Sequence, residues 1–243
     1  MGIKTNLREK LISLSGYWIY KKRDLPIGVD LFHDLKKIFS SNDITIFDVG
    51  SNVGITTLRF KKQFENSIIY SFEPVSKTFS VLQRKVQLLD KVYCFKLALG
   101  EKIETVEIKT FGEDWSVLNS LKPEAQNNAN EQSEAVSVVT GDSFCFDNKI
   151  NHIDLLKIDT EGYELKVLQG FEKTIREDRV KAIYCEVGFS NKNTRNTFIN
   201  DIVDFAGKNN FKFYGIYEIS NLSIHLNKNY GNVLLIRGDL TSD

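Results

Sequence analysis

Carboxylate side chains stand at the ends of apolar runs in both halves of the chain. Asp48 and Glu73 end or follow such runs in the first half, and Asp159, Glu161 and Glu186 do so in the second. Short β-branched runs of this kind are typical of buried strands. Ligands of open α/β sheets bind at the carboxyl ends of the strands. These acids are therefore candidates for ligand binding and for proton transfer.

The first of these acids begins a glycine-rich turn, Asp48-Val49-Gly50-Ser51-Asn52-Val53-Gly54. Glycine permits a sharp turn and a close approach of the backbone to a ligand, and the following helix offers free N–H groups. A carboxylate here would repel a pyrophosphate but would attract an ammonium group. We therefore expect S-adenosylmethionine (SAM) rather than a dinucleotide. A glycine-rich turn without a ligand is the alternative.

Glu73 lies at the tip of the next predicted strand, about 20 residues beyond the turn, where an acid can accept hydrogen bonds from ribose hydroxyls. Its alternative role is that of a carboxylate at the start of the helix that follows. Ala98-Leu99-Gly100 follows the third strand and would border the adenine. No Asp or Asn stands there, so backbone groups or Asp142 would have to read the exocyclic amine.

Hydrophobic periodicity places these residues on alternating strands and helices. We expect helices over 4–22, 31–40, 54–65, 76–89, 163–175 and 194–208. We expect strands over 44–49, 68–72, 92–97, 105–110, 135–140, 154–158, 180–185, 211–217 and 233–236. The strands 105–110 and 135–140 interrupt the alternation, and we interpret them as a hairpin-like insertion near the ligand. The stretch between them is either part of an acceptor site, a lid, or a plain surface loop.

Composition narrows the class of protein further. The 243 residues contain equal numbers of acidic and basic side chains, which argues against a strongly basic nucleic-acid-binding surface. Three scattered cysteines suit a reducing compartment, and we find no signal peptide, so we expect a cytoplasmic protein. The most apolar part of the N-terminus, Leu11–Tyr20, is too short to span a bilayer but is flanked by Lys and Arg. It could lie on an anionic membrane surface, pack on the domain, or make a dimer contact.

The order of these landmarks resembles that of FkbM-type SAM-dependent methyltransferases. The resemblance rests on Pro26–Asp30, Phe47–Gly54, Phe72-Glu73-Pro74, Ala98-Leu99-Gly100 and Ile153–Glu164, with Leu168 and Gly170 after them. It implies a Rossmann-like class I α/β fold with a seven-stranded, mostly parallel sheet in the order 3-2-1-4-5-7-6, strand 7 being antiparallel. It covers about residues 25–236. We divide the chain into an N-terminal helical extension, 1–41, and a methyltransferase domain, 42–243.

The resemblance also implies a set of site residues and a reaction. Asp48, Gly50, Asn52 and Gly54 would hold the methionine end of SAM, Glu73 the ribose, and Asp159 and Glu161 would face the transferred methyl group. We add four residues to the cofactor-binding set: Ser51 and Pro74, which adjoin these positions, Ala98, which would border the adenine, and Asp159 itself. The implied reaction is O-methylation of a sugar hydroxyl in a glycan, glycolipid or natural product, so a saccharide or glycolipid is the expected acceptor.

A sugar hydroxyl is a weak nucleophile and needs a base within hydrogen-bond reach. Asp159, Glu161, Glu186 and His225 are the candidates. In the alternative, the three acids bind Mg²⁺, which would orient and acidify the hydroxyl. A non-catalytic module that uses the same fold for glycan recognition or complex assembly is the competing function. A nucleic-acid methyltransferase is disfavoured, because the sequence at the strand tip is Asp-Thr-Glu-Gly and the chain is not basic.

Overall fold

The computed structural model describes residues 3–17, 19–111, 131–193, 195–220 and 229–240. Within them, seven strands form one sheet in the order β3-β2-β1-β7-β8-β10-β9. The strands are β1 (Thr45–Val49), β2 (Ile68–Phe72), β3 (Val92–Phe95), β7 (Ile153–Ile158), β8 (Val180–Gly188), β9 (Phe211–Tyr217) and β10 (Tyr230–Arg237). Counted within this sheet alone, the order is the expected 3-2-1-4-5-7-6, and β10 is antiparallel to both of its neighbours.

The central strands are buried along their whole length. Every residue of β1 and β7 is buried, as parallel strands covered on both faces require. On one face, Phe47 packs with Phe72, Phe144 and Phe171. On the other face, Ile46 and Leu155 belong to a second apolar cluster. The two clusters fix which strand ends lie side by side, and so they fix the position of the acids at those ends.

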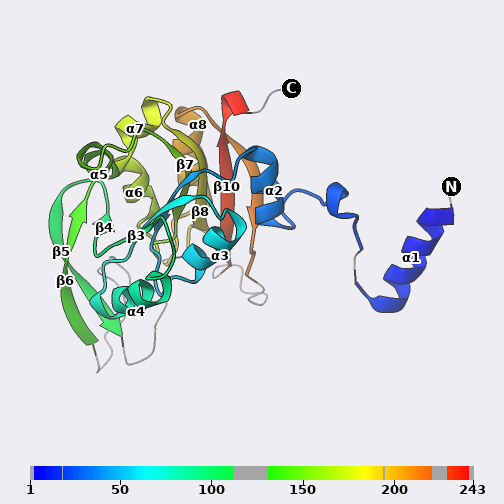
Figure 1. Cartoon of the computed structure of the whole chain (residues 1–243), viewed down its shortest axis with the longest axis horizontal. Helices are drawn as coiled ribbons and strands as arrows, with labels where there is room; N and C mark the ends of the chain where they lie inside the picture. Colours follow the sequence, from blue (N-terminus) through cyan, green and yellow to red (C-terminus); the bar gives the residue numbers. More distant parts are fainter. Residues whose placement is uncertain (1–2, 18, 112–130, 194, 221–228, 241–243) are drawn as a thin grey trace.

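Helices cover both faces of the sheet (Figure 1). Helices α2 (Leu31–Ile38) and α3 (Ile55–Gln63) contribute to one cluster, and α5 (Gly141–Asp147), α6 (Glu164–Gly170), α7 (Glu172–Arg176) and α8 (Ile199–Lys208) contribute to the other. Helix α4 (Ser76–Val86) lies between β2 and β3 in the chain. Single 3-10 turns, η1 and η3, cover Lys22–Asp24 and Gly238–Leu240.

Three helix predictions need correction, and one helix was not predicted. The helix expected over 4–22 is α1 (Ile3–Ser15), which ends before Gly16 at a φ of +70°. The helix expected over 163–175 is divided at Phe171 into α6 and α7. The helix expected over 194–208 starts at Ile199, because Glu161 and Glu164 hold the preceding segment through Arg195 and Thr197. Helix α5, whose N-cap is Thr140, was not predicted.

The predicted insertion is confirmed as an antiparallel pair, β5 (Glu104–Phe111) with β6 (Glu131–Val139), and the short β4 (Ala98–Leu99) joins it in a three-stranded sheet of the described residues. Val75, Ile108 and Val136 form a small buried cluster between this sheet and the start of α4. The stretch 112–130, for which a lid or an acceptor site was considered, lies outside the described residues.

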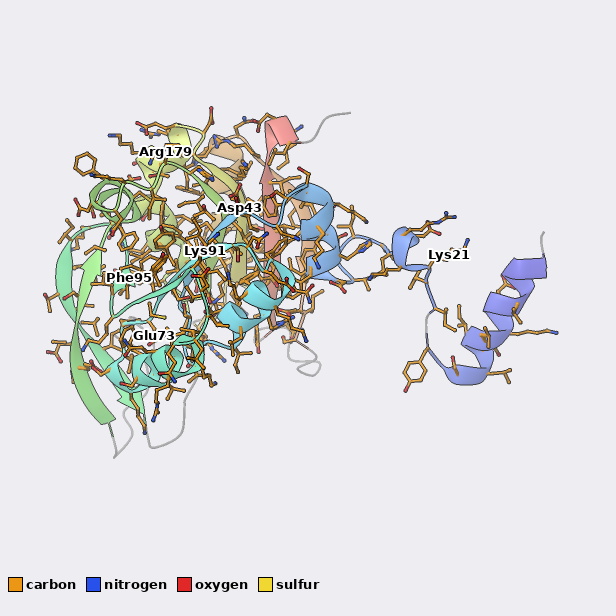
Figure 2. All side chains as sticks on the ribbon, viewed as in Figure 1. Lys21, Asp43, Glu73, Lys91, Phe95 and Arg179 are labelled. Carbon is orange, nitrogen blue, oxygen red and sulfur yellow. The ribbon has the colours of Figure 1, made fainter. Side chains whose placement is uncertain are left out.

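The N-terminal extension contains two differently placed helices. Helix α2 packs into the core through Leu31 and Leu35, whereas α1 and η1 stand away from the body (Figures 1 and 2). Figure 2 shows Lys21 on the segment that stands away. In the part of the chain that the structure describes, no helix combines the length and the hydropathy needed to cross a membrane.

Candidate active site

The turn after β1 is pressed against the end of β7. Gly50 has a φ of +78°, and a Cβ added to it would lie 1.8 Å from the carbonyl oxygen of Asp159. Gly54, with a φ of +81°, is the N-cap of α3, and a Cβ added to it would lie 2.7 Å from Leu82 Cδ1. Glycine at these positions therefore allows protein segments to approach one another. The expectation that Gly50 also permits a ligand's close approach stays a prediction.

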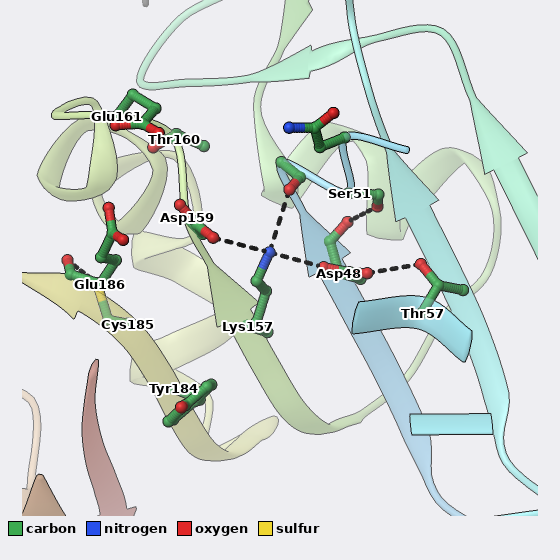
Figure 3. A network of polar contacts seen from close by, with 12 residues as sticks. Asp48, Ser51, Thr57, Lys157, Asp159, Thr160, Glu161, Tyr184, Cys185 and Glu186 are labelled. Carbon is green, nitrogen blue, oxygen red and sulfur yellow. Dashed lines mark hydrogen bonds and ion pairs between the residues drawn. The ribbon is translucent and has the colours of Figure 1, made fainter. Parts of the chain in front are cut away.

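Beneath the turn lies a buried ion pair, between Asp48 and Lys157 (Figure 3). Lys157 Nζ lies 3.0 Å from Asp48 Oδ1 and 3.6 Å from Asp159 Oδ2, and it donates a hydrogen bond of 3.1 Å to the Gly50 carbonyl. Thr57 donates a hydrogen bond of 2.6 Å to the other Asp48 oxygen. The Asp48 side chain is fully buried, so it braces the turn from below instead of reaching into the adjacent cleft.

The charge of Lys157 is maintained by its partners. Burial alone would lower the pKa of Lys157, but the carboxylates of Asp48 and Asp159 outweigh it and raise the pKa above its ordinary value. A permanently charged ammonium group thus connects the ends of β1 and β7. Paired buried charges of this kind tolerate the loss of one partner poorly.

A cleft opens above this ion pair, at the carboxyl ends of β1, β2 and β7. Six of the predicted cofactor-binding residues line it, whereas Asp48, Ser51 and Gly54 do not. The lining includes Gly50, Asn52, Glu73, Pro74, Ala98 and Asp159, together with Phe72, Leu97, Leu99, Ile108, Thr160 and Glu161. Asn52 Oδ1 is buried and finds no hydrogen-bond partner among the described residues. An unpaired acceptor in a cleft is the kind of group that a ligand's N–H donors satisfy.

Glu73 joins the turn to α4 at the wall of this cleft. Its Oε2 accepts a hydrogen bond from the backbone N–H of Asn52 at 2.9 Å. Its Oε1 accepts hydrogen bonds from the backbone N–H of Val75 at 3.0 Å and from the Thr78 hydroxyl at 2.7 Å. Burial raises the pKa of Glu73, against the effect of these hydrogen bonds. The carboxylate at the start of α4 is therefore confirmed, and the ribose role stays a prediction.

Asp142, the other candidate for the adenine, faces away from this site. Its carboxylate accepts hydrogen bonds from the backbone N–H groups of Lys173 and Thr174, at 2.9 and 2.8 Å, and from the Thr174 hydroxyl at 2.6 Å. Asp142 thus fixes the start of α7. Of the two candidates for the adenine, only the backbone groups near Ala98 border the cleft, and their role stays a prediction.

Beside the cleft, Asp159, Glu161 and Glu186 converge as expected. One carboxylate oxygen from each lies within 4.8 Å of one from each of the others, and Figure 3 shows the three side chains on neighbouring strand ends. Glu161 has a φ of +55°. Its two oxygens accept from Nε and Nη2 of Arg195.

These surroundings change the protonation of the cluster. Burial, together with the neighbouring Asp159 and Glu161 carboxylates, raises the pKa of Glu186 to about 9. Burial also raises the pKa of Glu161, although the Arg195 guanidinium opposes the shift. At neutral pH, Glu186 therefore carries a proton. The cluster combines a protonated acid, an ion-paired acid and Asp159, which lines the cleft.

A buried glutamate, Glu164, holds this cluster in place. Glu164 Oε1 accepts from the amides of Thr160 and Gly162 at 3.0 and 2.8 Å, and Oε2 accepts from the Thr197 hydroxyl at 2.5 Å. It thereby ties the loop after β7 to the segment before α8. Asn196, in that segment, donates a hydrogen bond of 2.5 Å to Glu186.

Lys157, Arg195 and Asn196 were also missed as site residues. Lys157 offered a signal, since it is a basic residue between Leu156 and Ile158 in the predicted strand 154–158. The loop residues offered none, because their partners come from distant parts of the chain. His225, the fourth candidate base, lies outside the described residues, so its role stays a prediction.

Comparison with known proteins shows the family of this chain. A family model described as the methyltransferase FkbM domain matches residues 48–213. Methyltransferase 1 of Beauveria bassiana is 26% identical over 194 residues, covering 68% of this chain and 76% of that protein. The 2-O-methyltransferase NoeI of Sinorhizobium fredii is 24% identical over 171 residues, covering 65% of this chain and 69% of that protein.

A solved structure shares the fold. The crystal structure of methyltransferase FkbM from Methylobacillus flagellatus superimposes with a TM-score of 0.53 at 13% identity, covering 81% of this chain and 44% of that one. The chain thus spans less than half of that protein. The family match covers most of the chain, including the turn, Glu73 and the acid cluster. The chain belongs to the FkbM methyltransferase family and is a SAM-dependent methyltransferase.

Proposed function

We propose that this enzyme transfers the methyl group of SAM to a hydroxyl oxygen of a saccharide in a glycan, glycolipid or natural product. The observation that carries the proposal is the group of Asp159, Glu161 and Glu186 beside the cleft. A hydroxyl nucleophile requires a proton acceptor as it attacks, and carboxylates within reach of the donor supply one. The name of the relative NoeI, a 2-O-methyltransferase, supports oxygen as the acceptor atom.

The cleft residues fit the donor by their chemistry. The unpaired Asn52 oxygen suits the ammonium group of the methionine end, and the Glu73 carboxylate at the cleft wall suits ribose hydroxyls. Apolar Leu97 and Leu99 line the same cleft and suit an adenine ring. Bound there, SAM supplies an activated methyl group on a sulfonium, and the chain supplies position and exclusion of water.

In the proposed step, an oxygen–carbon bond forms as the carbon–sulfur bond breaks, and the bonding pair stays on sulfur. The hydroxyl proton moves to Asp159, which is the most exposed of the three acids, with 35% of its side chain accessible. Protonated Glu186 donates a hydrogen bond that orients the acceptor. Glu161, which lines the cleft, is held by Arg195.

Turnover tests this proposal. The purified enzyme, SAM and a saccharide extract should yield S-adenosylhomocysteine together with a saccharide whose mass has grown by one methylene group. If SAM binds but no saccharide, lipid-linked glycan or hydroxylated natural product is methylated, the acceptor class is wrong. Binding without any turnover would instead favour the non-catalytic module.

The close approach of three carboxylates favours one second candidate, a Mg²⁺-assisted transfer. A divalent cation would have to share Glu161 with Arg195, whose guanidinium already neutralises it. Turnover in the presence of EDTA decides between the two. Undiminished activity would exclude a metal requirement. Loss of activity that added Mg²⁺ restores would establish that the transfer depends on Mg²⁺.

A further inference from the structure

Helix α1 carries an apolar stripe that the body of the protein does not cover. Leu7, Leu11 and Leu14 are spaced so that they share one helical face, and they are 60%, 46% and 85% exposed. Tyr17, just after the helix, is 76% exposed. Leucine side chains on a helix that stands away from the core need an apolar surface outside the fold (Figure 1).

The charge of the same segment indicates which surface this is. Residues 1–23 contain six Lys or Arg and one Glu, a net charge of +5, so the rest of this formally neutral chain sums to −5. Lys10, Lys21, Lys22 and Arg23 are exposed. Several Lys and Arg residues on or beside an amphipathic helix are typical of segments that bind anionic lipids.

The residues between the helix and its basic end strengthen this assignment. The sequence there is Tyr17-Trp18-Ile19-Tyr20-Lys21-Lys22-Arg23. Trp and Tyr are enriched where hydrocarbon meets headgroups, because their rings are apolar and carry one polar atom. At 13 residues, α1 is about 20 Å long, shorter than the ~30 Å hydrocarbon core. It can therefore lie in the interface but cannot cross it.

We propose that residues 3–23 dock the enzyme on the surface of an anionic lipid bilayer, with the leucine stripe among the acyl chains and the basic residues at the headgroups. A second copy of the chain is the competing occupant, since its acidic body could attract the same segment. The bilayer is favoured because the stripe, the aromatic residues and the basic end occur together in the order that an interface requires. The inference goes beyond the proposed function and does not depend on the acceptor.

Flotation with vesicles of stated composition tests it on the full chain. The protein should float with vesicles of phosphatidylcholine and phosphatidylglycerol, and it should remain behind with phosphatidylcholine alone. Added salt should weaken the binding. Changing Lys21, Lys22 and Arg23 together to Gln should reduce the affinity on the order of a hundredfold. Leu11→Gln with Leu14→Gln should reduce it at least about tenfold.

Matched changes on the body provide the controls. Lys62, Lys85 and Lys208 changed to Gln remove the same charge from other exposed positions, and Leu88→Gln replaces a leucine that is 92% exposed. These variants should bind vesicles like the wild type. All variants should retain turnover of soluble acceptors, which separates this test from that of the proposed function. Two results would overturn the proposal. One is that the wild-type protein does not bind anionic vesicles. The other is that the leucine changes abolish self-association of the protein and leave vesicle binding unchanged.

Discussion

Lys157 Nζ lies 3.0 Å from Asp48 Oδ1, and both side chains are buried at the ends of adjacent parallel strands. The same ammonium group donates to the Gly50 carbonyl and faces Asp159. One lysine therefore contacts the base of the cofactor turn and the acid proposed to take the proton. Lys157 therefore holds the turn at Gly50 and the Asp159 carboxylate in position relative to each other, although it does not line the cleft itself.

Lys157→Met should destabilise the fold and weaken SAM binding. Removing the cation leaves Asp48 as an uncompensated buried charge, which costs about 3–5 kcal/mol. The double variant with Asp48→Asn should regain most of the stability, because no buried charge remains. It should still bind SAM more weakly than the wild type, because the Gly50 carbonyl has lost its donor. Urea unfolding and calorimetric titration with SAM measure the two effects.

Lys181→Met is the control for this experiment. Lys181 pairs with Asp154 at 2.7 Å, and neither residue lines the cleft. Its loss should leave SAM affinity unchanged. Wild-type SAM affinity in the Lys157 and Asp48 double variant would show that Lys157 only balances a charge.

The raised pKa of Glu186 predicts a pH dependence of stability. The folded state holds a proton on Glu186 up to about pH 9, whereas the unfolded carboxyl releases it near its ordinary value of 4.5. Between these values the folded state binds more protons, so this group makes stability fall as pH rises. Glu186→Gln keeps a neutral side chain and should flatten the slope by up to about 1.4 kcal/mol per pH unit.

Urea unfolding of wild type and Glu186→Gln at a series of pH values measures this difference. Asp159, Glu161, Glu164 and Arg195 also act on Glu186, so they must be unchanged in both proteins. Glu172→Gln, on the exposed pair with Arg176, serves as the control and should leave the slope unaltered. Parallel pH profiles for wild type and Glu186→Gln would show that Glu186 is ionised in the folded protein.

The ribose role of Glu73 can be separated from its structural role by an analogue. Glu73→Gln should lower SAM affinity roughly tenfold or more, the worth of a hydrogen bond to a charged group. It should also weaken the start of α4 by about 1 kcal/mol. A 2′-deoxy analogue of S-adenosylhomocysteine should lose affinity for the wild type but not for the variant. If the wild type and the variant lose affinity for the 2′-deoxy analogue equally, Glu73 does not bind the ribose and has only its structural role.

The fold could be predicted because short apolar runs in the sequence identify its central strands. The apolar runs that became β1 and β7 are fully buried, and the acids and glycines at their ends mark the cleft. Two of the strands, Ile68–Phe72 and Phe211–Tyr217, were predicted to the residue. The local pattern was sufficient for strands that are buried throughout, such as β1 and β7, and for the partly exposed β9.

Long-range contacts explain what could not be predicted. Arg195 was assigned to a helix, but Glu161 and Glu164 hold its segment in a loop. Asp48 was expected to face a ligand's ammonium group, and nothing in the local sequence showed that Lys157 would occupy that carboxylate. Gly170, the last residue of α6, also packs against a distant segment, because a Cβ added to it would lie 2.0 Å from the Gly100 carbonyl oxygen.

The central claim is that the cleft binds SAM while Asp159 takes the proton from the acceptor. Asp159→Asn, assayed for SAM binding and for turnover on the same preparation, tests it most directly. SAM affinity should stay within a few-fold of wild type, and turnover should fall by about a hundredfold or more. Full activity in Asp159→Asn would contradict the account.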